Sequence, residues 1–146
     1  MRTFLLVLHI VGVAAWLGGN LTQMMVLPMM ERAEHTAAIA WHRASGQMAK
    51  IYYSIAGALI MVTGICLVIE GPYTFSDGFV SVGFLVVIIG GVMGVVFFAP
   101  ASRAAITAHE LGGGPTLQAV LKRFTMGAIV DTGLVIFTVY AMVAKL

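Results

Sequence analysis

Charged residues are scarce in this chain, and their scarcity argues against most classes of soluble protein. Only 10% of the 146 residues are Asp, Glu, Lys or Arg, whereas 60% are hydrophobic, and the mean hydropathy is +1.01. Soluble domains contain about 25% charged residues. The formal net charge of +2 is too small to predict a nucleic-acid partner. The composition therefore predicts a membrane protein whose main partner is the lipid bilayer.

Cysteine and the common catalytic motifs are also lacking. Cys66 is the only cysteine, so the chain cannot form an internal disulfide. The sequence contains no phosphate-binding loop, no zinc-protease His pair and no nucleophile elbow. The argument for function therefore depends on the polar residues inside and beside the apolar segments.

Long apolar runs, in contrast, dominate the chain. Four of them reach the roughly 20 residues that span about 30 Å of hydrocarbon, at about 3–30, 51–69, 79–99 and 124–143. Because the first run continues through Met30, we expect a spanning helix there rather than a cleaved signal peptide. We expect Pro100 to end the third apolar helix. We also expect a short helix within 31–50 and a helix break at the Gly-Gly-Gly-Pro of 112–115. Residues 1–146 are thus predicted to form a single transmembrane domain.

The predicted fold is an all-α integral membrane four-helix bundle. Each half consists of a helix, a proline, a basic connection containing histidine, and another helix, which is compatible with two repeated helical hairpins. Six of the eight Lys and Arg residues lie in the first and third connections. The positive-inside rule places these connections in the cytoplasm and both termini outside. We therefore expect a multi-pass protein of the bacterial inner membrane.

Polar residues of the first span follow one helical face. Their spacings of 3, 4, 4 and 3 place five residues in one narrow sector: His9, Gly12, Trp16, Asn20 and Gln23. An unpaired polar group in hydrocarbon costs several kcal/mol, so the other helices should cover this stripe. The spacing of small residues on the other spans predicts that these helices pack closely against the polar stripe.

Two polar layers are expected inside the bundle. The outer layer surrounds His9 and includes Tyr140, with Met61 about one turn deeper. The inner layer contains Asn20 and Asp131, because the fourth span runs opposite to the first and brings Asp131 to a similar depth. Asp131 is expected to bond to Asn20 or a neighbouring hydroxyl, or else to serve as a proton or cation site.

His9 has two interpretations. As an intramembrane ionisable residue it is a candidate ligand for haem b or copper. No second His occurs in a predicted span, so Met61 or the His9 of a second copy would complete the ligand set. Alternatively, His9 is a neutral packed residue that donates to a backbone carbonyl or to Tyr140. Three further histidines, His35, His42 and His109, could gather a metal, but without compact ligand spacing we expect ordinary interfacial residues.

The run LHIVGVAAWLGG carries His9, then Trp16 seven residues later, then Gly18-Gly19. It resembles the first helix of the CopD-like and HemJ-like bacterial membrane proteins, which include a copper-resistance subunit and a haem-pathway oxidase. This resemblance implies a helical bundle with a buried first-helix His, implicated in haem binding in the HemJ-like enzymes and matched here by His9. Pro28 follows this His about one turn later than in the HemJ-like pattern, and the later functional Lys has no counterpart in the second or third span.

The overall expectation is a small membrane protein without catalysis, an accessory or assembly subunit that binds partners through its glycine faces in a homodimer or larger membrane complex. The first alternative is a haem- or copper-binding redox protein that uses His9. The second alternative is an element of a proton or cation pathway that uses Asp131.

Overall fold

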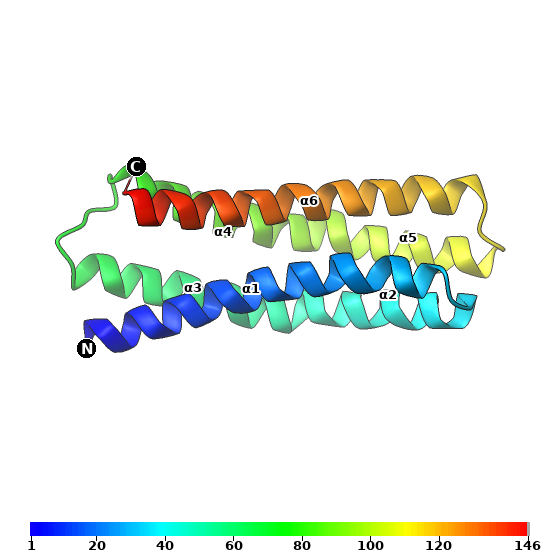
Figure 1. Cartoon of the computed structure of the whole chain (residues 1–146), viewed down its shortest axis with the longest axis horizontal. Coiled ribbons are helices and arrows are strands. Elements are labelled where there is room, and N and C mark those ends of the chain that lie inside the picture. The colour runs from blue at the N-terminus through cyan, green and yellow to red at the C-terminus, as the bar shows by residue number, and fades with distance from the viewer. Residues whose placement is uncertain (146) are drawn as a thin grey trace.

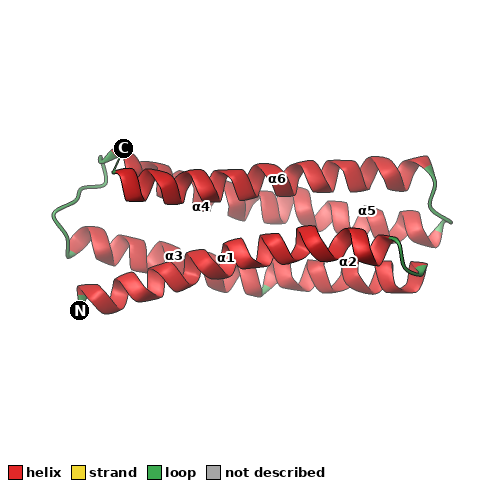
Figure 2. Ribbon diagram, viewed as in Figure 1, coloured by secondary structure: helices red, strands yellow, loops and turns green. Residues whose placement is uncertain are grey.

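The computed structural model describes residues 1–145, which are helical apart from short turns. In chain order the elements are α1 (Arg2–Glu31), α2 (His35–Lys50), α3 (Tyr52–Ile69), α4 (Gly78–Met93), the π-helical turn η1 (Gly94–Phe98), α5 (Ala99–Glu110) and α6 (Pro115–Ala144). Figure 2 shows helices throughout, with the longer loops at the two ends of the molecule. The predicted all-α class is therefore confirmed.

These elements build four long rods. α2 continues into α3, and α4 continues through η1 into α5, so that the rods comprise 30, 35, 33 and 30 residues. All four are long and apolar enough to cross a membrane. They run side by side along the molecule, and both termini lie at the same end (Figure 1). At about 1.5 Å per residue each rod measures about 45–53 Å, which exceeds the roughly 30 Å of hydrocarbon in a bilayer.

Most of the charged residues lie at the end opposite the termini. We call this the polar end, comprising residues 28–50 and 99–123, and the other the termini end. The predicted helix within 31–50 is confirmed as α2, and the predicted break at 112–115 is confirmed by the turn between α5 and α6. Gly112, Gly113 and Gly114 have φ values of 90°, 80° and 86°, which residues with a side chain rarely adopt. This turn returns the chain toward the bundle.

The prediction that Pro100 ends the third helix is wrong. The rod passes through Pro100 because η1, immediately before it, has a wider turn in which the Ala99 N–H donates to the Gly94 carbonyl five residues back. In a regular α-helix a proline ring collides with the carbonyl four residues earlier and leaves it unpaired. The π-helical turn shifts the hydrogen-bonding register and accommodates the proline.

The core lies where α1 meets the other three rods. Trp16 is 5% exposed and packs against Ala56 and Ile60 of α3, Val86 of α4 and Val135 of α6. The α1 residues buried beside it include His9, Gly12 and Asn20, so the predicted polar stripe faces the interior. Large apolar side chains such as Val95, Met25 and Ile10 are exposed on the outside, as expected for surfaces that contact lipid.

Candidate metal centre

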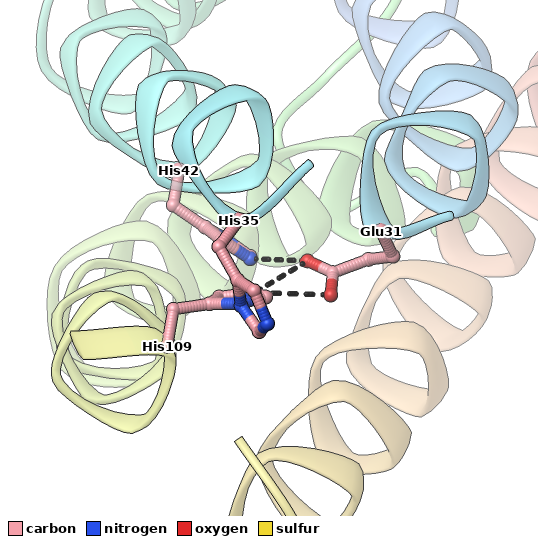
Figure 3. Close-up of polar contacts among 4 residues, drawn as sticks. All are labelled: Glu31, His35, His42 and His109. Atoms are coloured by element: carbon pink, nitrogen blue, oxygen red, sulfur yellow. Dashed lines mark hydrogen bonds and ion pairs between the residues drawn. The ribbon is translucent and has the colours of Figure 1, made fainter. Parts of the chain in front are cut away.

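Three helices bring a carboxylate and two imidazoles together at the polar end. Glu31 is the last residue of α1, His42 lies in the middle of α2, and His109 is the next-to-last residue of α5. Glu31 lies on the continuation of the α1 stripe, four residues after buried Leu27. The tight turn at residues 32–34 folds α2 back along α1, and α2 packs along α5. Figure 3 shows the two histidine side chains pointing toward the Glu31 carboxylate.

The distances within this cluster are short. His42 Nε2 lies 2.9 Å from Glu31 Oε1, and His109 Nε2 lies 3.0 Å from Glu31 Oε2 and 3.3 Å from Oε1. One potential ligand atom from each residue falls within 4.8 Å of the other two. A tetrahedral ion with bonds of about 2.0–2.1 Å needs ligand atoms about 3.4 Å apart. Small rotations of the side chains would therefore admit an ion between them.

A third histidine, His35, contacts His109 on the side away from Glu31. His35 Nδ1 lies 2.9 Å from His109 Nδ1, and the two rings are edge-on, with an interplanar angle of 76°. One of the two nitrogens must carry the proton and the other the lone pair. If His109 binds a metal through Nε2, its Nδ1–H donates to His35. Metal-ligating histidines usually have such a partner for the second nitrogen, because it fixes the tautomer and the ring orientation.

Burial sets the protonation of His42, whose side chain is only 1% exposed. Desolvation lowers the pKa of His42 from its ordinary value of 6.5, while the hydrogen bond to Glu31 opposes this shift. The ring is therefore neutral at pH 7 and can offer the lone pair that a metal requires. Phe124 packs edge-on against the same ring, with centroids 6.2 Å apart, and limits access of water.

The types of ligand atom in the cluster indicate which metal ions it would suit. Two imidazole nitrogens and a carboxylate suit Zn²⁺, and the same combination with open positions suits Fe²⁺. Soft Cu⁺ favours thiolates and thioethers, and Glu31, His42 and His109 provide neither. The cluster thus suits a first-row divalent ion of borderline softness.

A second polar cluster lies inside the bundle, between the polar end and the termini end. Asn20 Nδ2 donates to Asp131 Oδ2 at 2.7 Å, and Trp16 Nε1 donates to the same oxygen at 3.2 Å. The predicted contact between Asn20 and Asp131 is confirmed, and Trp16 is an additional partner. Gln23, the last residue of the stripe, donates to Tyr53 at 3.2 Å. These bonds tie α1 to α6 and α3, which gives the polar stripe a structural role.

The residues predicted around His9 are only partly brought together. His9 and Met61 line the same cavity near the termini end. Tyr140 is 60% exposed on the outside of α6, and His9 Nδ1 instead lies 3.0 Å from Thr63 Oγ1. The expectation of a contact between Tyr140 and His9 is therefore wrong. Thr138 faces the interior, and Tyr140, two residues later, is rotated about 200° from it around the helix.

The sequence argument did not identify Glu31 as part of a site, and it expected the histidines at the polar end to be interfacial. In the structure His42 and His109 are buried. One signal was present, because the stripe spacing continues from Gln23 through Leu27 to Glu31. Another was the seven-residue spacing of His35 and His42, which places both on one helical face. Neither signal could show that α5 packs against α2.

Comparison of the chain with protein-family models, curated proteins and solved structures found no match. The resemblance to CopD-like and HemJ-like proteins therefore stays a prediction.

Proposed function

We propose that this chain is an integral membrane protein of the bacterial inner membrane that binds a first-row divalent metal ion, Zn²⁺ or Fe²⁺, at its polar end. One observation carries the proposal: Glu31, His42 and His109, from three different helices, place potential ligand atoms within 4.8 Å of one another. Most of the Lys and Arg residues lie at the same end, which supports a cytoplasmic site and termini on the outside.

Three protein ligands leave at least one coordination position for water or a substrate. Sites of that kind are typical of catalytic or exchanging metals, whereas structural zinc sites have four protein ligands. A cavity of about 310 Å³ between α1 and α6 is lined by Glu31, so the carboxylate of the cluster borders open space. The expectation of a non-catalytic accessory or assembly subunit remains the alternative, and it requires no metal.

The decisive experiment is metal binding by the purified protein. After treatment with a chelator, the detergent-solubilised chain should take up one Zn²⁺ or one Co²⁺ per chain, and Co²⁺ should give the visible absorption of a tetrahedral complex. Replacing both His42 and His109 with Gln should abolish uptake, because two of the three ligands are lost. If the protein takes up no metal, or if the double variant takes up as much as the parent, the cluster is only a hydrogen-bonded network and the proposal fails.

His35 provides a graded test of the same site. Replacing His35 with Ala should weaken Zn²⁺ binding by about tenfold to 100-fold, the usual effect of removing an outer partner of a ligating histidine. The stoichiometry should stay at one ion per chain, because the three ligands remain. Competition with a chromophoric zinc chelator measures the change. An unchanged affinity would mean that the contact between His35 and His109 does not orient the ligand.

A further inference from the structure

The termini end contains a cavity that the metal site does not use. It has a volume of about 320 Å³, lies between α1, α3, α4 and α6, and is almost entirely apolar. Its inner wall includes His9, Trp16, Met61, Phe84 and Val86. At the termini end the Arg2 guanidinium and the Lys145 ammonium lie 5.9 Å and 5.7 Å from the centre of the Tyr73 ring, and all three residues line the cavity.

The contacts of Thr63 determine which nitrogen of His9 carries its proton. The Thr63 hydroxyl donates to the Leu59 carbonyl one turn earlier, and its single hydrogen is used there. The oxygen can then only accept from His9, whose Nδ1 lies 3.0 Å away. His9 Nδ1 is therefore the protonated nitrogen, and Nε2 carries the lone pair.

His9 Nε2 is an acceptor without a donor. No hydrogen bond reaches Nε2 within residues 1–145, and His9 as a residue is 8% exposed. His9 Cε1, the carbon bonded to both ring nitrogens, packs against α3, where a Cβ at Gly64 would lie 3.4 Å from it. His9 also lines the cavity. A hydrogen-bond donor in the cavity would give this unpaired acceptor a partner in otherwise apolar surroundings.

The shape and lining of the cavity indicate which class of molecule could donate a hydrogen bond to His9 Nε2. A volume of about 320 Å³ is near the lower limit for ligand pockets and suits one ring with part of a tail. Trp16, Phe79 and Phe84 provide aromatic surfaces against which a flat ring packs well. The site therefore fits an apolar molecule with an aromatic hydroxyl better than it fits an ionic ligand.

We propose that this cavity binds a membrane-soluble phenol or hydroquinone with an apolar tail, whose hydroxyl donates a hydrogen bond to His9 Nε2 and whose ring packs beside Trp16. The site is independent of the metal centre and lies at the other end of the bundle. Binding requires no redox change of the ligand, because recognition depends on a single hydrogen bond and apolar contact.

The test compares a decyl-substituted benzohydroquinone with its dimethyl ether, which has the same ring and tail but no O–H donor. In a Trp41→Phe background Trp16 is the only tryptophan, so its fluorescence reports binding in the cavity. The hydroquinone should bind about fivefold to tenfold more tightly than the ether, the effect of one hydrogen bond. His9→Leu should abolish this preference, and His9→Gln, which keeps an acceptor, should retain part of it.

Several outcomes would overturn the proposal. Equal binding of the hydroquinone and the ether to the parent protein would do so without any variant, even if His9→Leu failed to fold. Equal competition by decane, which has no O–H group, would assign the cavity to lipid chains, and a Soret band on haem addition that His9→Leu abolishes would assign it to haem. Glu31→Gln should leave hydroquinone binding unchanged, so failure of the metal proposal remains separate from failure of this one.

Discussion

Replacing Glu31 with Gln should lower the affinity of the protein for Zn²⁺ by about 60- to 700-fold. Structural zinc sites with four ligands contribute about 10–16 kcal/mol, so one ligand corresponds to about 2.5–4 kcal/mol. Gln has nearly the same size as Glu and can still accept hydrogen bonds from His42 and His109, so the packing of the three helices is retained. What disappears is the negative charge that compensates the ion.

Glu34 provides the matched control, because it lies three residues from Glu31 and is exposed. Its only side-chain hydrogen bond within the described residues is one of 3.5 Å from Thr36. Glu34→Gln should bind Zn²⁺ like the parent protein. A thermal shift gives a second readout, since saturation at 100 times the dissociation constant stabilises a folded protein by about 2.7 kcal/mol. An equal Zn²⁺-induced shift in both Gln variants would place the ion elsewhere.

The bundle itself was largely predictable from the sequence. The apolar runs located the four rods, and the polar stripe of the first run identified the face of α1 that is buried. The contact between Asn20 and Asp131 followed from counting the rise per residue along two antiparallel helices. Such arguments succeed because membrane helices are regular and a bilayer fixes their depth. The parallel repeat of two hairpins stays a prediction.

The cluster of Glu31, His42 and His109 was not predictable in the same way. Its three residues come from three helices, in segments that lie beyond the apolar spans. How these helices are rotated relative to one another depends on their packing, and the length of an apolar span gives no information about it. Glu31 and His109 are 78 positions apart in the chain, and their contact requires α5 to continue past Pro100. We expected the third span to end at the proline, so the direction of the helical segment that follows it, and with it the position of His109, could not be predicted. The π-helical turn that keeps the rod continuous has no clear sequence signature.

Replacing Gly90 with Ala destabilises the bundle by about 1–3 kcal/mol, the usual cost of overpacking a tight core. A Cβ at Gly90 would lie 2.5 Å from Trp16 Cζ2 and 3.2 Å from Asp131 Oδ1. Neither group can move easily. The indole is fixed by its hydrogen bond to Asp131 and by Ile60 and other core residues, so α4 must move away from α1 and α6. The displacement also weakens the polar cluster that joins these helices.

Gly91 makes this prediction a matched comparison, because it is the next residue of α4 and faces outward. A Cβ there meets no atom within 4 Å among the described residues. Gly91→Ala should therefore leave stability unchanged or raise it by up to about 1 kcal/mol, since Ala favours a helix over Gly. Thermal unfolding in detergent, followed by circular dichroism, compares the two variants directly. Equal melting temperatures would show that Trp16 can give way, and that the contact of α4 with Trp16 and Asp131 does not fix the bundle.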